Sequence, residues 1–240
     1  MARIVPLAVA GVVLLVVFKG CGREAEFDEP GGNAVADGPR TLAPAQMGEA
    51  VLTRPEVPEA FAPAEDREVF AGLRPDDPDC ARLLRLADLR DGASLQGREA
   101  HAAFYRPRPP ASVAEHVFRL GPGEATRYVA KARTAARGCP EIGIPAGSRE
   151  ETLGRTWLRR PAGVKDAVGA IYSRDAVYSR RQGGTALSML LVRSRNDLLV
   201  LSSAGEGLAG EPMEKLAAGA VRKLQAFQLE RARQATQKTP

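Results

Sequence analysis

The sequence is poor in the residues that most often carry out catalysis or bind metals. It contains two histidines, three cysteines and one tryptophan among 240 residues. No CxxC or HxxxH spacing is present, so the common ligand pattern of a zinc site is missing. A serine nucleophile would need His101 or His116 as its base, and no GxSxG motif positions such a serine. These absences argue against an enzyme, a resident metal and a cofactor.

An excess of charge of one sign is also missing. The formal net charge is +5, and it falls to about +3 when Arg3 and Lys19 are set aside with the N-terminal segment. A nucleic-acid-binding protein normally shows a denser basic surface. We therefore predict that nucleic acid is not a partner.

Long apolar runs are absent except at the N-terminus. Arg3 precedes the apolar residues Ile4 to Phe18, which as a helix would span roughly 22 Å against a hydrocarbon core of about 30 Å. A basic residue followed by a short apolar segment is typical of an export signal. We assign residues 1–20 to a signal peptide or membrane anchor.

Cys21 lies directly after this segment. The residues Gly20 and Cys21 fit the bacterial lipobox, which the segment resembles, whereas Phe18 and Lys19 depart from its pattern. Three outcomes therefore stay open: lipidation at Cys21, an uncleaved membrane anchor, or release as a soluble protein. The first two would tether the protein to the outer face of a membrane.

The remaining cysteines, Cys80 and Cys139, are then left as a pair. Lipidation of Cys21 would use the odd cysteine of an exported protein and leave a single disulfide. Such a bridge closes a loop of about 60 residues, for which chain-entropy estimates give roughly 4 kcal/mol of stabilisation. We predict one Cys80–Cys139 disulfide.

Composition divides the rest of the chain into three parts. Residues 21–44 are rich in glycine, proline and acidic side chains, with almost nothing apolar to bury, and are predicted to be a flexible acidic tether. Residues 45–230 have the apolar content of one folded domain. Residues 231–240 are predicted to be a disordered basic tail.

Hydrophobic periodicity within residues 45–230 alternates between helix and strand. Helices are predicted from Pro78, from Ala125 to Cys139, and from Pro212 onwards. Strands are predicted at residues 50–54, 99–106, 112–120, 153–160, 167–180, 186–193 and 198–203. The last three strands are expected to form a meander. The fold class is therefore α+β, a two-layer sandwich with a mostly antiparallel sheet flanked by about three helices.

The order of these features resembles a known family. Cys80 near the start of one helix, Cys139 at the end of the next, a strand bearing Trp157, a closing hairpin and a last amphipathic helix are similar to the PknH-like extracellular sensor domain of actinobacterial kinases and lipoproteins. The likeness covers roughly residues 45–230. It implies a two-layer domain with a cleft over an antiparallel sheet, used for sensing or ligand binding outside the cell, with no established catalytic set.

Basic residues concentrate on the central predicted strands. One interpretation is an anion-binding face for phospholipid headgroups or wall polymers, and the favoured alternative is a solvent-facing surface that protects the sheet from edge aggregation. The candidate residues are Arg155, Arg159, Arg160, Arg174, Arg180 and Arg181, with Lys165 among them. Trp157 and Tyr172 are predicted to be core residues.

Two further patterns receive structural interpretations. Gly205, Gly207 and Gly210 form a literal GxGxxG between a strand and a helix, but Glu206, Glu211 and Glu214 bring negative charge to the helix N-terminus where a pyrophosphate would bind. We interpret the glycines as a loop.

His101 and His116 either face each other across a hairpin as a pH-sensitive pair or, as favoured, are unrelated strand residues.

Together these features predict a membrane-tethered extracytoplasmic lipoprotein with a non-enzymatic, sensor-like or ligand-binding domain. Its predicted partners are the membrane and an unknown envelope ligand or protein. One alternative is a carrier or chaperone-like lipoprotein for an apolar envelope molecule, which needs a deep apolar pocket. A second alternative is a secreted hydrolase, which needs converging polar groups.

Overall fold

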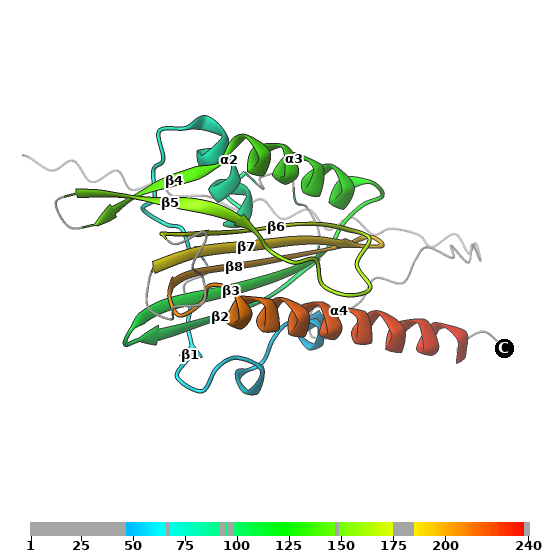
Figure 1. The fold of residues 1–240 in the computed structure, drawn as a ribbon. Helices are drawn as coiled ribbons and strands as arrows, with labels where there is room; N and C mark the ends of the chain where they lie inside the picture. Colours follow the sequence, from blue (N-terminus) through cyan, green and yellow to red (C-terminus); the bar gives the residue numbers. More distant parts are fainter. Residues whose placement is uncertain are drawn as a thin grey trace, which may run out of the picture. The chain divides into compact units, whose positions relative to one another are not determined.

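A computed structural model describes residues 47–65, 68–91, 95, 98–146, 149–174 and 185–237. These residues form one antiparallel sheet with helices on both of its faces (Figure 1). The predicted signal segment, Cys21 and the tether lie outside the described residues, as does the predicted turn at 182–184. Among the described residues, no helix combines the length and apolar character needed to cross a membrane.

The sheet has eight strands in the order β1-β2-β3-β8-β7-β6-β5-β4. Every neighbouring pair is antiparallel. The last strand in the sequence, β8, therefore lies inside the sheet between β3 and β7. The strands are β1 (Ala62–Pro63), β2 (Arg98–Pro107), β3 (Pro110–Arg119), β4 (Glu141–Ala146), β5 (Arg149–Trp157), β6 (Asp166–Ser173), β7 (Thr185–Ser194) and β8 (Asp197–Glu206).

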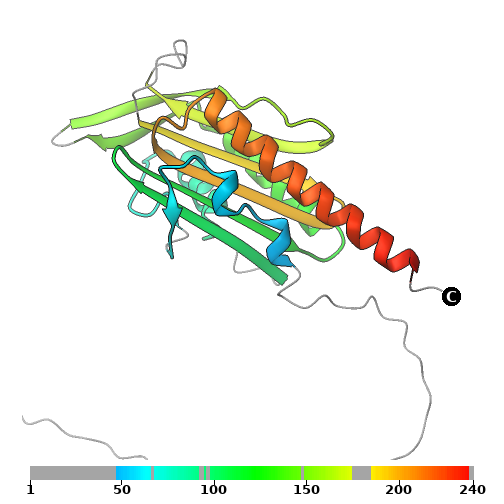
Figure 2. The ribbon, with the colours of Figure 1, turned by 90° about the horizontal axis from the view of Figure 1, so that it is seen from below.

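Three α-helices of the described residues divide between the two faces of the sheet (Figures 1 and 2). α2 (Pro78–Ala87) and α3 (Glu124–Gly138) cover one face. α4 (Glu211–Gln237) covers the other face, together with the N-terminal segment that contains the 3-10 turns η1 (Gly48–Ala50) and η2 (Arg54–Glu56). The predicted α+β sandwich is confirmed, and the structure adds a third layer to the two that were expected.

Apolar side chains of the central strands point alternately to the two faces of the sheet and so contribute to both apolar layers. In β8, Leu198 and Val200 point towards α2 and α3, whereas Leu199 and Leu201 point towards α4. All four side chains are fully buried. Because successive strand residues face opposite sides of the sheet, a near-continuous apolar run such as β8 predicts a strand that is covered on both faces.

Several elements differ from the sequence prediction. Residues 50–54 are not a strand, because Thr53 and Glu56 form a capping box and Pro55 occupies the first turn of η2. The strand β4 was not predicted at all. α4 continues through Gln237, so the predicted start of a tail at Arg231 was wrong.

Candidate functional site

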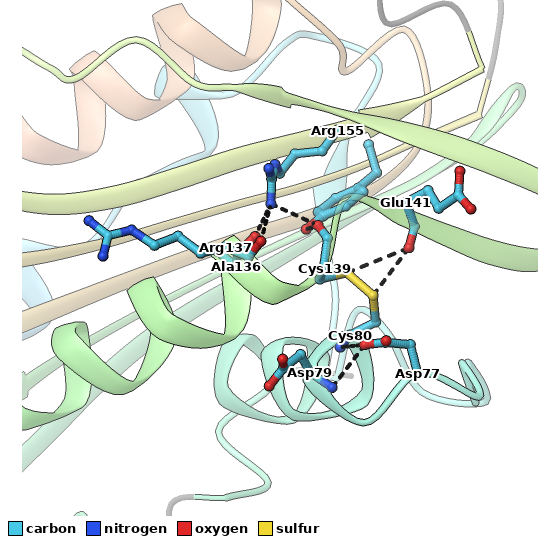
Figure 3. The surroundings of a disulfide bond; sticks show 9 residues. Asp77, Asp79, Cys80, Ala136, Arg137, Cys139, Glu141 and Arg155 are labelled. Carbon is cyan, nitrogen blue, oxygen red and sulfur yellow. Dashed lines mark hydrogen bonds between the residues drawn. A yellow bond between two sulfur atoms is a disulfide. The ribbon is translucent and has the colours of Figure 1, made fainter.

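The disulfide joins the beginning of α2 to the end of α3 (Figure 3). Asp77 caps α2, and its carboxylate accepts hydrogen bonds from the backbone N–H groups of Asp79 and Cys80 at 2.9 Å. Cys139 follows the last residue of α3, and the two Cα atoms are 4.8 Å apart. Both cysteines are buried. The predicted Cys80–Cys139 bridge is confirmed.

Two side chains satisfy the free carbonyl groups at the C-terminus of α3. The Arg155 guanidinium donates to the carbonyl oxygens of Ala136, Arg137 and Cys139 (Figure 3). The Tyr172 hydroxyl donates to the Cys139 carbonyl at 2.9 Å, and burial raises its pKa to about 12. A cation at this end of a helix also interacts favourably with the helix dipole. Arg155 and Tyr172 therefore fix the helix end that carries Cys139.

Trp157 lies at the surface, contrary to its prediction as a core residue. Its side chain is 49% exposed, and the guanidinium carbon of Arg155 lies 4.3 Å from the centre of its ring. Pairing between β4 and β5 ends at Glu141 and Gly154, so further along β5 the only strand partner among the described residues is β6. Tyr172 is fully buried, which confirms its predicted place in the core.

The six arginines of the candidate anion-binding face have different environments. Arg155 is engaged with α3, and Arg174 forms an ion pair with Glu151 at 2.6 Å. Arg159 and Arg160 are exposed. Arg180 and Arg181 lie outside the described residues. Anion binding stays a prediction, which now depends chiefly on Arg159 and Arg160.

The two histidines are directly opposite each other in the β2–β3 hairpin. Their ring centres are 6.0 Å apart, and Oε1 of Glu99 lies 2.8 Å from His116 Nδ1 and 3.9 Å from His101 Nδ1. The favoured interpretation of two unrelated residues was therefore wrong, and the facing pair is what the structure contains. Within the described ranges, no group of three or more His, Cys, Asp or Glu side chains is arranged to hold a metal ion.

Two buried carboxyl groups were missed by the sequence analysis. Oε2 of Glu115 accepts from the backbone N–H of Leu52 at 2.5 Å, and burial raises the pKa of this carboxyl to about 8. Its Oε1 has no hydrogen-bond partner among the described residues. Asp88 accepts from the backbone N–H groups of Val69 and Phe70, and burial raises its pKa to about 6. The only sequence signal was an acidic residue among apolar neighbours, within β3 for Glu115 and directly after α2 for Asp88.

The glycines of the GxGxxG sequence have structural roles. Gly205 is part of β8 with φ +126, and an added Cβ would lie 2.3 Å from the carbonyl oxygen of Pro110. Gly207 and Gly210 also have positive φ values, of 72 and 63, which glycine adopts without steric cost. Close strand pairing and turn geometry therefore account for these residues without a nucleotide.

The described residues define an α+β sandwich cross-linked by one disulfide, with an arginine and a tyrosine fixing the bridged helix. No protein-family profile and no curated protein sequence matches the chain. Among solved structures, it is similar to the extracellular domain of PknH from Mycobacterium tuberculosis, with a TM-score of 0.57 and 13% identity over 79% of this chain and 100% of that chain. A second structure, an uncharacterised protein from Mycobacterium smegmatis, gives a TM-score of 0.42 and 12% identity over 75% of this chain and 96% of that chain. The PknH-like fold predicted from the order of elements is confirmed.

Proposed function

We propose that this chain is a membrane-tethered extracytoplasmic protein whose folded domain senses or binds a component of the cell envelope. The Cys80–Cys139 disulfide is the observation that carries this proposal. Disulfides persist in oxidising compartments outside the cytoplasm. The similarity in fold to the extracellular domain of PknH supports the same placement.

The proposed attachment is a lipid on Cys21. The apolar run Ile4 to Phe18 and the Gly20-Cys21 pair support export followed by anchoring. Residues 21–44 would then hold the domain near the outer face of the membrane, with a root-mean-square reach of roughly 27 Å for a flexible chain of this length. In this arrangement the domain meets envelope components and external ligands.

The proposed role is non-enzymatic. The buried polar groups of the described residues connect elements of the fold, as in the cluster around Asp197. Arg119 donates two hydrogen bonds of 2.8 Å to this carboxylate, and Gln228 donates a third of 2.6 Å. These contacts join β3, the first residue of β8 and α4. A cluster of this kind supports a structural role for these buried charged groups, and no observation on the described residues favours the carrier or the hydrolase.

The test is the intact mass of the protein extracted from membranes, measured with and without reductant. The expected mass is that of a chain beginning at Cys21 with added acyl groups, and reduction should add the two hydrogens of a single bridge. Cys21→Ala should abolish acylation and leave the bridge intact. The double variant Cys80→Ala/Cys139→Ala serves as the matched control, because it should retain the acyl groups and lose the response to reductant.

Two outcomes would overturn parts of the proposal. An unprocessed wild-type chain with no acyl group would refute lipidation. Free thiols at Cys80 and Cys139 in the protein taken directly from membranes would refute placement in an oxidising compartment.

A further inference from the structure

An exposed aromatic side chain and three exposed basic side chains are close together in the sequence, at the end of β5 and in its connection to β6. Trp157 ends β5, and Arg159, Arg160 and Lys165 follow in the connection to β6. All four residues are exposed. Arg160 donates to the carbonyl oxygen of Lys165 at 3.4 Å, which folds this connection back on itself. We call these four residues the Trp157 patch.

No acidic side chain of the described residues neutralises the positive charges of the Trp157 patch. No ion pair among the described residues involves Arg159, Arg160 or Lys165. The next acidic residue, Asp166, is held by Arg133 at 2.5 Å and Arg193 at 3.0 Å. The patch therefore combines three positive charges in the β5–β6 connection with one large exposed aromatic ring at the end of β5.

The indole of Trp157 makes no contribution to either apolar core. It belongs to neither buried cluster, and its contact with Arg155 occurs at the surface. Tryptophan combines an apolar body with a polar N–H group, which is why it concentrates at the membrane–water interface. Lysine and arginine beside such a ring are attracted to anionic headgroups.

We propose that the Trp157 patch docks the domain on the surface of an anionic phospholipid bilayer. This inference rests on the proposed membrane tether, because the tether keeps the domain within reach of the bilayer and lets a weak contact persist. Each basic residue close to an anionic surface strengthens binding about fivefold. Docking would orient the domain, with the β5–β6 connection against the membrane.

The sequence contains one tryptophan, so the fluorescence of the protein reports directly on the patch. The full chain would be reconstituted with vesicles of phosphatidylcholine alone and with vesicles that also contain phosphatidylglycerol. A blue shift of the Trp157 emission, with quenching by brominated lipid, is expected only with the anionic vesicles. High salt should reverse both signals, because it screens charge attraction.

Two double variants distinguish a contribution of the Trp157 patch to vesicle binding from an effect of the protein's overall charge. Arg159→Ser/Arg160→Ser should weaken association with anionic vesicles about 25-fold, as two basic contacts are lost, and abolish the emission shift. Arg231→Ser/Arg233→Ser removes the same charge from α4 and should leave the shift unchanged. Equal losses in the two double variants would overturn the assignment to the patch.

Flotation of the vesicles distinguishes failure of the docking proposal from failure of the tether. A chain that floats with both kinds of vesicle without an emission shift has a tether and no docking patch, which overturns this inference alone. A chain that floats only with anionic vesicles and shows the shift supports the patch and refutes the tether. Absence of flotation with both kinds refutes both proposals. A shift with a soluble anionic glycan but none with vesicles would also overturn membrane docking.

Discussion

Glu115 should make the domain less stable as the pH rises. Its carboxyl is fully buried in the layer between the sheet and α4, where Leu201 of β8 and Ala102 of β2 are its neighbours in strand register. Burial raises its pKa from 4.5 to about 8, although the Leu52 N–H and the charge of Lys223 favour the ionised form. Between these two values the folded state binds a proton that the unfolded state releases. Stability is therefore present in full below pH 4.5 and is lost as the pH rises to about 8.

The size of the effect follows from the two pKa values. Each tenfold difference in proton affinity is worth about 1.4 kcal/mol, so the full difference between 4.5 and about 8 amounts to roughly 5 kcal/mol. Between pH 5 and pH 8, the expected loss of unfolding free energy from this group is roughly 3 to 4 kcal/mol. For a domain of this size, that loss corresponds to roughly 10 °C in melting temperature.

The variant Glu115→Gln isolates this contribution. Glutamine keeps an oxygen for the Leu52 N–H and carries no charge at any pH. The free energy of unfolding would be measured by urea denaturation at pH 5 and pH 8 for both proteins, with the disulfide intact. The stability of Glu115→Gln relative to wild type should rise by roughly 3 to 4 kcal/mol between the two pH values. Glu214→Gln, on the exposed side of α4, is the matched control. The same difference between wild type and Glu115→Gln at both pH values would refute the reasoning.

Four other variants test the structural roles described above. Arg155→Ala should lower the free energy of unfolding by about 2 to 3 kcal/mol, because it removes charged hydrogen bonds to the end of α3; an unchanged urea midpoint would contradict this role. Cys80→Ala/Cys139→Ala should lower the free energy of unfolding by about 4 kcal/mol, because the bridge closes a loop with a sequence separation of 59. A loss below about 1 kcal/mol would show that the bridge adds little constraint. Gly205→Ala should lower the free energy of unfolding by at least about 3 kcal/mol, because its Cβ would meet the backbone of β3. Gly207→Ala should lower it by about 1 kcal/mol, from positive φ alone. Equal melting temperatures of the two variants would contradict the close approach at Gly205.

The sequence predicted the elements that have a regular apolar period. α3 was expected from Ala125 to Cys139 and extends over Glu124–Gly138, because small and apolar residues recur on one helix face and glycine precedes its start. The strands β2 and β3 also lie close to their predicted ranges. Local patterns suffice in these cases, because each element shows in its own sequence which side is buried.

Other features depend on partners that are distant in the sequence. The strand β4 contains Gly143 and Pro145, which disfavour strands, and it forms because β5 pairs alongside it. At Gly143, an added Cβ would overlap the Glu150 side chain. Trp157 lies just past the point where β4 stops pairing, and no local pattern marks this point. The contacts from Arg155 to α3 span 16 to 19 residues and follow from the packing of the helix on the sheet.

The central position of β8 has a consequence for the order in which the chain can fold if it is exported as proposed. β8 is the last strand to leave a translocation channel that passes the chain from its N-terminus, yet it joins the β1–β2–β3 group to the β7–β6–β5–β4 group. Before Asp197–Glu206 emerges, each group has an open edge that β8 covers in the folded domain. Pairing between distant segments is slow, and uncovered strand edges favour aggregation. In the proposed export, the two half-sheets therefore have to remain apart until Glu206 has emerged, when more than four-fifths of the 240 residues are already outside.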